Sequence, residues 1–338
     1  MPNSFITLNQ QSIEQRVGIY LPPKMLANAQ PWLVLEKLGP LRTPLPKNKG
    51  ENIKWKRNVP FDVTTDTLVE GVTPAPQNFR QEIVTDAIDE YGAFSVITDK
   101  VEDLHEDMIL DSIAEEMGKQ VASTKELISW QTVRGGTQVV YSGTATSRAT
   151  VEDVVNINQV RAGVAVLKGN HGNMVTQRLA ASQNYATEPV GASYVIAGHT
   201  DQQYDWEDLD GFTPIEKYGQ VKPLCEYEIG KVKDARIVLT PQLQPFYGAG
   251  SATTTGVLSR DGAAVDVYAS ILMAKEFWGT TTLSGTDSVR VEVQPPGKPT
   301  KDDPLGQRGF ASWKFYYCAT RLNESWGVRI EAAATDWA

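Results

Sequence analysis

The hydrophobic and polar positions of this 338-residue chain change their spacing several times, and each spacing predicts a different element. Apolar and basic residues alternate over 52–57, and a second alternating run covers 81–97. Together they predict the two strands of a long hairpin. The segment between them is polar and rich in Thr and Pro, so we expect a weakly structured tip. A hairpin of this length buries little of its own surface and needs support from elsewhere.

A long amphipathic helix is expected after the hairpin. Asp99 and Glu102 are spaced as in a capping box, and apolar residues then recur every three or four positions to about residue 130. At 1.5 Å per residue this spine helix would be about 45 Å long, and Gly135-Gly136 would end it. Its apolar stripe consists of Leu104, Met108, Ile113, Met117, Val121, Thr124 and Ile128, of which the first five are candidate core residues.

A second helix and a mixed region follow. Thr150 and Asp153 form another cap signal, apolar residues face one way from Val154 to Leu167, and Gly169-Asn170 ends the helix. From residue 191 the pattern becomes mixed, which predicts an α+β fold. The elements expected there are a strand at 193–197, an acidic helix or turn at 201–210, a strand at 235–240, a Gly/Ser/Thr-rich loop at 248–256 and an apolar run at 265–273.

The C-terminal part has the clearest strand pattern. Trp313, Phe315 and Tyr317 alternate with residues such as Lys314, and a second alternating run covers 326–331. The two runs predict a closing hairpin with one aromatic face. Trp313, Phe315 and Tyr317 are therefore further candidate core residues.

The first 50 residues lack a sustained period and contain seven prolines. Proline fixes φ and removes a backbone donor, so we expect an extended N-terminal arm here. The apolar patch Trp32-Leu33-Val34-Leu35 could dock the arm on a partner, and an arm without a partner would stay disordered. Trp32 and Leu33 are therefore candidate intersubunit contacts.

The net charge of −9 conceals an asymmetry along the chain. Residues 1–60 carry nine bases and three acids, residues 61–130 carry sixteen acids and four bases, and the remainder is −3. Segments of opposite charge can attract within one subunit or between copies, although solvated surfaces are the simpler interpretation for any single charge. The charged residues that we take as candidate intersubunit contacts are Lys47, Lys49, Lys54, Lys56, Arg57 and Glu70.

Composition excludes several classes of protein. With 41% hydrophobic and 22% charged residues the chain is not globally disordered, and its acidic balance argues against a protein that wraps nucleic acid. Cys225 and Cys318 lie too far apart for a disulfide framework or a CxxC metal site. We find neither a secretory signal nor an apolar run long enough to span a membrane, so we expect synthesis in the cytoplasm and no membrane partner.

Motifs for catalysis or ligand binding do not rise above background. His105-Glu106 begins like a zinc-protease helix, but Ile109 stands where the second histidine is required. The acidic turn ending in Gly211 fails the EF-hand pattern, which leaves a solvated turn as the favoured interpretation and looser calcium binding as the alternative. We therefore expect no catalytic, cofactor-binding or metal-ligating residues, no cofactor and no enzyme activity.

The order of these elements resembles the major capsid proteins of tailed double-stranded DNA phages with the Hong Kong 97 fold. The closest resemblance is to the coat protein of the N-four-like podoviruses, and it covers residues 52–130 and 303–332 best. The matching motifs are Leu68-Val69-Glu70-Gly71-Val72-Thr73-Pro74, Tyr91-Gly92, Thr98-Asp99, Asp303-Pro304-Leu305-Gly306-Gln307-Arg308-Gly309, Trp313-Lys314, Leu322-Asn323-Glu324 and Arg329-Ile330-Glu331.

The resemblance implies a domain layout and a set of partners. Residues 1–50 would be the N-terminal arm, 51–97 an extended hairpin loop, 98–190 a peripheral domain with the spine helix, 191–285 an axial domain, and 286–338 C-terminal strands returning to the peripheral domain. Many copies would assemble through hexamers and pentamers into an icosahedral shell, the capsid of the virion. The shell would enclose double-stranded DNA without sequence-specific binding, with portal, scaffolding and decoration proteins as further partners.

Two other functions stay open at this point. An encapsulin-like nanocompartment would use the same fold to enclose a protein cargo. A soluble hydrolase with a carboxylate pair between residues 191 and 290 belongs to a different class, and the absence of any catalytic spacing counts against it.

Overall fold

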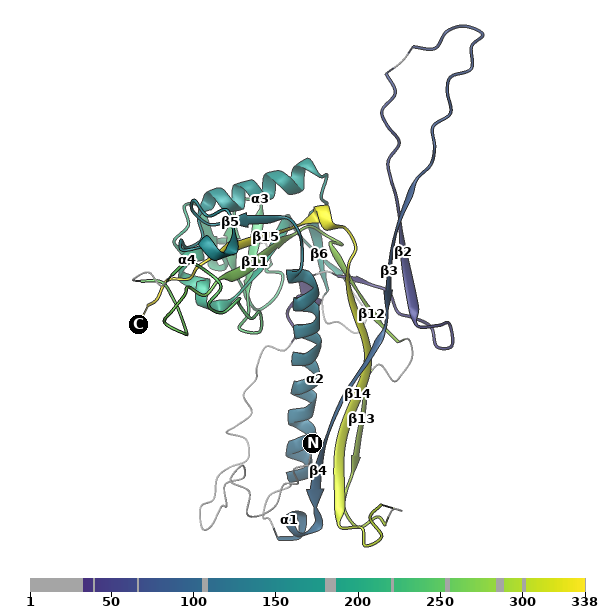
Figure 1. Cartoon of the computed structure of the whole chain (residues 1–338), viewed down its shortest axis with the longest axis vertical. Helices are drawn as coiled ribbons and strands as arrows, with labels where there is room; N and C mark the ends of the chain where they lie inside the picture. The colour runs from purple at the N-terminus through teal and green to yellow at the C-terminus, as the bar shows by residue number, and fades with distance from the viewer. Residues whose placement is uncertain are drawn as a thin grey trace.

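A computed structural model of the chain describes residues 33–38, 40–65, 67–104, 109–179, 187–219, 222–252, 256–283, 289–299 and 302–337. Two sheets, each packed against a helix, form the body, and one long hairpin projects from it (Figure 1). No helix within these ranges is long and apolar enough to cross a membrane. The helices are α1 (Asp99–Leu104), α2 (Ile109–Arg134), α3 (Ile157–Gly169) and α4 (Gln203–Glu207), with 3-10 turns η2 (Leu35–Leu38), η3 (Arg148–Thr150), η4 (Thr200–Gln202), η5 (Ile215–Lys217) and η6 (Glu324–Trp326).

The first sheet has five strands and is built around one long central strand, β14 (Arg308–Arg321). Along one side of β14, β4 (Asp89–Thr98) pairs antiparallel over ten residue pairs. Along the other side lie β13 (Val289–Gln294) and then β12 (Trp278–Thr282), and β1 (Leu41–Arg42) adds to β12 in parallel.

Helix α2 covers one face of this sheet and runs beside β14 and β4 (Figure 1). Alternation along β14 puts Trp313, Phe315 and Tyr317 on the covered face, where all three are buried. Met117 and Val121 are buried on the facing stripe of the helix. The apolar stripe expected for a spine helix thus meets the aromatic face expected for a strand. Of the other stripe residues, Ile113 is half-buried, the side chain of Leu104 is not described, and Met108 lies outside the described residues.

The second sheet has eight strands and lies beside the C-terminal end of α2 (Figure 1). Its inner strands are almost wholly apolar, and α3 packs on one face through Val160, Val164 and Leu167. The strands are, in spatial order, β5 (Val139–Tyr141), β15 (Gly327–Ala332), β11 (Tyr268–Met273), β7 (Thr187–Gly198), β10 (Ala235–Leu239), β9 (Glu228–Val232) and β8 (Phe212–Pro214), with β6 (Val175–Leu179) paired to β7.

The second helix begins later than the sequence predicts. Helix α3 is capped by Asn156, whose side chain accepts from the backbone of Asn158, while Gln159 bonds back to the Asn156 backbone. Thr150 instead closes the turn η3, because its hydroxyl bonds to Ser147. The prediction failed because two Ser/Thr/Asn cap signals stand close together and the earlier one caps only a single turn.

The extended hairpin is shorter than the alternation predicts. β2 (Asn52–Asn58) pairs with β3 (Gln81–Ala87), but the run over 81–97 is interrupted at Ile88. Beyond that point β4 pairs with β14 and belongs to the first sheet. One alternating run therefore supplies strands to two sheets.

The predicted closing hairpin is wrong in its pairing, although both of its strands exist. β14 lies in the first sheet and β15 in the second, with η6 between them. The chain turns at Leu322 and Asn323, whose backbone N–H groups both donate to the carbonyl of Phe277. β15 is therefore a strand of the second sheet, and α3 packs on the same sheet.

Candidate intersubunit surfaces

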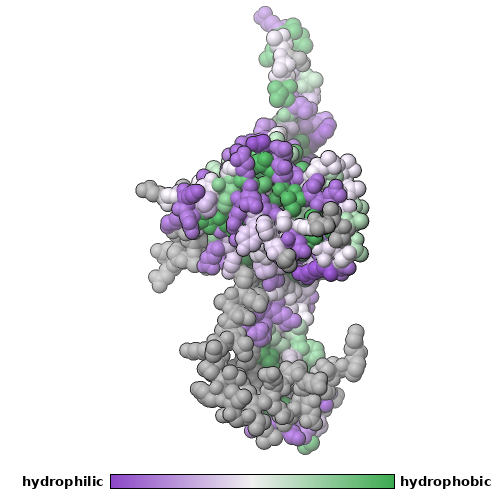
Figure 2. Space-filling view, turned by 90° about the vertical axis from the view of Figure 1, so that its left-hand side faces the viewer, coloured by the Kyte–Doolittle hydropathy of each residue, from purple (hydrophilic) through white to green (hydrophobic). Residues whose placement is uncertain are grey.

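The hairpin of β2 and β3 is anchored to the body at its base. Trp55 Nε1 donates a hydrogen bond to Thr43 Oγ1 at 3.2 Å, and Asp86 Oδ2 accepts one from the Thr320 hydroxyl on β14. Beyond these contacts the hairpin projects past the rest of the molecule (Figures 1 and 2). Its shape is therefore set locally, while its outer half depends on something outside the subunit for burial.

The charged residues predicted on the hairpin are all exposed. Lys54 and Lys56 share one face of the hairpin, while Arg57 on the other face forms an ion pair with Glu82 across the strands. Glu70 is exposed at the tip, in the turn where Gly71 has a positive φ of 76°. An exposed ion pair of this kind contributes at most about 1 kcal/mol, so these charges do little for the stability of the subunit.

Apolar side chains are also exposed along the outer half of the hairpin (Figure 2). Val63 is 90% exposed and Leu68 is 78% exposed, and the rings of Phe61 and Phe79 contact each other at 6.1 Å without a core beneath them. Exposed apolar side chains gathered on one projecting segment are typical of a protein interaction site. The full set is Phe61, Val63, Leu68, Val69, Val72, Phe79 and Ile83.

The described part of the N-terminal arm packs into the subunit itself. Val34, Leu35 and Leu38 are buried in the same core as α2 and β14. Leu33 is half-buried beside them, and Trp32 lies outside the described residues. The apolar patch that was expected to dock on a partner therefore docks, in its described part, on its own chain. Lys47 and Lys49 follow this segment and are exposed.

Glu126 on α2 holds this segment in place. Its Oε1 accepts hydrogen bonds from the backbone N–H groups of Leu35 at 2.9 Å and Val34 at 3.3 Å. The side chain is fully buried, and burial raises its pKa to about 7 despite these hydrogen bonds. Glu126 was not among the residues predicted from the sequence, although an acid four positions before the apolar Trp130 on one side of a helix was a signal for it.

A groove of about 360 Å³ crosses the face of the first sheet that α2 leaves uncovered. It lies over Gly92, where the missing side chain exposes the backbone of β14, and the exposed ring of Phe94 forms one wall. Charged side chains of both signs surround it, namely Lys314, Arg290 and Glu292. The groove is open and polar, and its lining holds no set of residues suited to catalysis.

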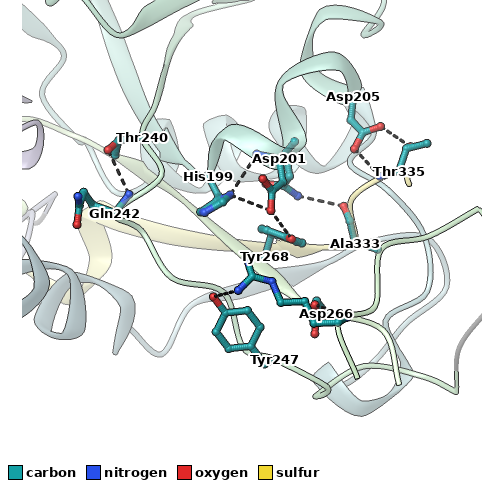
Figure 3. A network of polar contacts seen from close by, with 12 residues as sticks. His199, Asp201, Asp205, Thr240, Gln242, Tyr247, Asp266, Tyr268, Ala333 and Thr335 are labelled. Atoms are coloured by element: carbon teal, nitrogen blue, oxygen red, sulfur yellow. Dashed lines mark hydrogen bonds and ion pairs between the residues drawn. The ribbon is translucent and has the colours of Figure 1, made fainter. Parts of the chain in front are cut away.

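A network of polar side chains next to the second sheet contains a histidine and several carboxylates, the residue types that an enzyme site would use (Figure 3). His199 Nδ1 accepts from the Asp201 backbone at 3.1 Å, and Asp201 Oδ2 accepts from the Tyr268 hydroxyl at 2.7 Å. Burial lowers the pKa of His199 below its ordinary value of 6.5, so the imidazole is neutral near pH 7. With its Nδ1 used to cap η4, this histidine has a structural role.

The carboxylates around this network also have structural roles, because they accept hydrogen bonds from residues of neighbouring loops. Asp205 accepts from both the backbone and the hydroxyl of Thr335 (Figure 3), and Asp266 accepts from the backbone N–H groups of Gly248 and Arg260. The acidic turn at 205–211 is thus only partly solvated, because Asp205 is buried. No group of three or more metal-ligating side chains occurs among the described residues.

Neither cysteine is placed for nucleophilic chemistry. Cys225 and Cys318 are both buried, and burial raises the pKa of each thiol to about 11. Both side chains therefore remain protonated near pH 7 and unreactive.

A buried ionic junction joins α2 to the second sheet. Glu331 on β15 is fully buried and accepts two hydrogen bonds from Arg148, at 2.9 and 2.7 Å, while Arg329 Nε lies 2.6 Å away. Arg329 also donates to the carbonyl of Gly136 beyond the end of α2. The guanidinium of Arg148 lies 3.5 Å from the centre of the Phe246 ring. This junction links the C-terminal end of α2 to β15 of the second sheet.

Comparison with known proteins agrees with this description. No protein-family model matches the chain. A major capsid protein of Pseudomonas phage KPP21 is 24% identical over 278 residues, which span 76% of this chain and 69% of that protein. Among solved structures, the capsid of Ralstonia phage GP4 superposes with a TM-score of 0.68 at 12% identity, covering 99% of both chains. The head structure of Helicobacter pylori bacteriophage KHP40 gives a TM-score of 0.61 at 9% identity, covering 97% of this chain and 98% of that one. The chain therefore has the α+β fold of phage capsid subunits, similar to that of Hong Kong 97-type capsids.

Proposed function

We propose that this chain is the major capsid protein of a tailed bacteriophage, a structural subunit rather than an enzyme, which self-associates into the shell of the virion head. The observation that carries this proposal is the agreement over nearly the whole length with a phage capsid subunit, the projecting hairpin included in the region covered. The exposed apolar side chains of that hairpin need a surface outside the subunit, and copies of the same chain provide one.

The subdomains of such a subunit can be matched to the described elements as part of this proposal. The hairpin of β2 and β3 is the extended loop, the first sheet with α2 is the peripheral domain, and the second sheet with α3 is the axial domain. Assigned in this way, β15 and α3 belong to the axial domain. This assignment differs from the sequence-based boundaries and is supported by sheet membership and by the core that α3 shares with β11 and β15.

The finer parts of the proposal rest on sequence resemblance. We assign the chain to the N-four-like podovirus coat proteins on its hairpin-tip and C-terminal motifs. Hexamers and pentamers would close an icosahedral shell around double-stranded DNA, with portal, scaffolding and decoration proteins as further partners. The acidic balance of the chain supports a wall that surrounds DNA without adhering to it.

Expression of the full chain followed by size-exclusion chromatography and negative-stain electron microscopy tests the proposal. We expect rings of five or six copies or closed shells. Elution as a monomer or dimer under all conditions, with or without other head proteins of the same virus, would overturn it. Shells that contain a specific protein cargo and never DNA would instead support a nanocompartment.

A further inference from the structure

Strand β13 forms an open edge of the first sheet. It pairs with β14 over six consecutive residues, from Val289 opposite Phe315 to Gln294 opposite Phe310, without a bulge. Among the described residues no strand pairs with its other side. A regular edge strand of this kind offers its unpaired backbone groups as a template for another strand.

The two faces of β13 differ in character. Val289, Val291 and Val293 lie on the face that α2 covers, since their partners on β14 are the buried Phe315, Trp313 and Ala311. At this edge of the sheet Val291 nevertheless remains 49% exposed and Val293 41% exposed. The opposite face carries the exposed charges of Arg290 and Glu292.

The sequence of β13 complements itself. Residues 289–293 read Val-Arg-Val-Glu-Val, so a second copy running antiparallel about Val291 places Arg290 opposite Glu292 in both directions. Val291 then faces its own counterpart, and Val289 faces Val293. Opposite charges and β-branched residues are both favourable as directly opposed pairs.

We propose that β13 is a two-fold contact between copies of this chain, at which the β13 strands of two subunits pair antiparallel in the register centred on Val291. The proposal rests on the proposed function and deepens it by naming a surface at which subunits meet. The first sheets of two subunits would become one continuous sheet, and the exposed valines would form an apolar row between the two α2 helices.

The charge pattern also selects against neighbouring registers. A shift of two residues in one direction places Arg290 opposite Arg290 of the second copy, and in the other direction places Glu292 opposite Glu292. A shift of one residue places charges opposite valines on the wrong face. The outer side of β4 provides a contrast, because its only charged residues are Asp89 and Glu90 and it cannot complement itself.

A pair of six-residue strands is a small interface. Stable protein complexes bury about 1,600 Å² in total, which two short strands do not approach. We therefore expect the contact to form only within assemblies, where many other contacts hold the copies together. This agrees with the exposure of the valines in the single subunit.

Cysteine cross-linking in assembled particles tests the register. Val291→Cys should form disulfide-linked dimers, because directly opposite residues have Cβ atoms about 5 Å apart. Val293→Cys alone should not, since its two copies would lie about 14 Å apart along the strands, whereas a mixture of Val289→Cys and Val293→Cys subunits should. The native cysteines are buried, so wild-type particles serve as the background control.

Charge reversal tests the complementarity. Arg290→Glu or Glu292→Arg alone places two like-charged pairs in each contact and should lower the yield of particles roughly tenfold. The double variant Arg290→Glu/Glu292→Arg restores both opposite pairs and should recover the wild-type yield. Intact particles in which neither Val291→Cys subunits nor mixed Val289→Cys and Val293→Cys subunits form disulfide-linked dimers would overturn the inference and leave the proposed function intact. A double charge variant with no better particle yield than the single ones would do the same. Failure of the wild-type chain to assemble would instead count against the proposed function.

Discussion

The carboxylate of Glu126 accepts a hydrogen bond from the backbone N–H of Leu35 at 2.9 Å, across 91 positions of the sequence. One buried acid on α2 therefore fixes the segment that enters the core from the N-terminal arm. The charges of Glu36 and Lys37 shift the pKa of Glu126 in opposite directions, and each does so less than burial.

The raised pKa of Glu126 predicts a specific pH dependence of stability. The folded chain holds the proton with a pKa of about 7, against 4.5 when exposed. This contribution to the free energy of unfolding is therefore complete below pH 4.5 and is lost as the pH rises through 7. At roughly 1.4 kcal/mol per pKa unit it amounts to about 3 kcal/mol. Urea unfolding of the unassembled subunit should show this decline, and Glu126→Gln, which keeps an acceptor oxygen, should flatten it. Equal pH slopes in the two proteins would contradict the assignment.

Truncation of the N-terminal arm should be tolerated up to residue 33 but should destabilise the fold when it extends to residue 51. A chain that begins at residue 33 keeps Val34, Leu35 and Leu38 and should fold. A chain that begins at residue 51 loses these three buried side chains, each costing about 2–5 kcal/mol, and leaves Glu126 buried without its donors. Circular dichroism of both proteins would show the difference. A cooperative melt of the shorter chain near the temperature of the longer one would show that the segment is dispensable.

Trp313→Ala should destabilise the subunit by about 3–5 kcal/mol. The side chain is buried, its Nε1 donates to Gln120 on α2 at 2.9 Å, and its ring stacks on Phe315 at 5.3 Å between centroids. Phe94→Ala, on the exposed face of the same sheet, is the matched control and should change stability by less than about 0.5 kcal/mol. Thermal melts that rank the two variants in the opposite order would mean that the faces of β14 are reversed.

Arg148→Met should cost about 3–5 kcal/mol, because it leaves the buried charge of Glu331 with one partner fewer. Lys168→Met removes an ion pair to Asp234 in which both side chains are about half exposed, and it should cost less than about 1 kcal/mol. Urea unfolding of the two variants gives the comparison. Similar losses would indicate that the Arg148 junction contributes no more than a surface pair.

Replacing exposed apolar residues at the hairpin tip should separate assembly from folding. Leu68→Ser with Val69→Ser removes apolar surface that the subunit itself does not bury, so the melting temperature should stay unchanged. Particle yield by electron microscopy should fall. Leu305→Ser, at a leucine of similar exposure just before β14, is the matched control for loss of exposed apolar surface away from the hairpin. Normal particles from the double variant would remove the tip from the contact surface.

Helices and strands with a regular spacing of hydrophobic residues were predictable from the sequence. The elements against which they pair or pack were not. The stripe of α2 and the alternation of β14 are local properties, so the buried positions of Met117, Val121 and Trp313 follow from spacing alone. The separation of β14 from β15 depends on Leu322 and Asn323 bonding to Phe277, more than forty positions earlier. Contacts between residues so far apart in the sequence produce no periodic pattern of hydrophobic and polar positions from which they could be predicted.

The candidate intersubunit residues likewise include some whose location was predictable from the sequence and some whose location was not. The exposure of charged residues such as Lys54 and Glu70 was predictable, because a two-stranded hairpin has no core in which a charged side chain could be buried. The segment from Leu33 was expected to seek a partner, since proline-rich sequence gives no sign of an internal docking site. That site exists only because Glu126 supplies an acceptor and α2 an apolar surface next to it.

The ladder between β4 and β14 is oriented to resist tension along the molecule. Its ten residue pairs run along the long axis of the molecule (Figure 1), and their hydrogen bonds lie perpendicular to the strands. Tension along that axis therefore strains all of these bonds in shear at once, whereas a sideways pull would peel them apart one at a time. We therefore expect the β4–β14 ladder to resist extension along the direction in which α2 and β14 run.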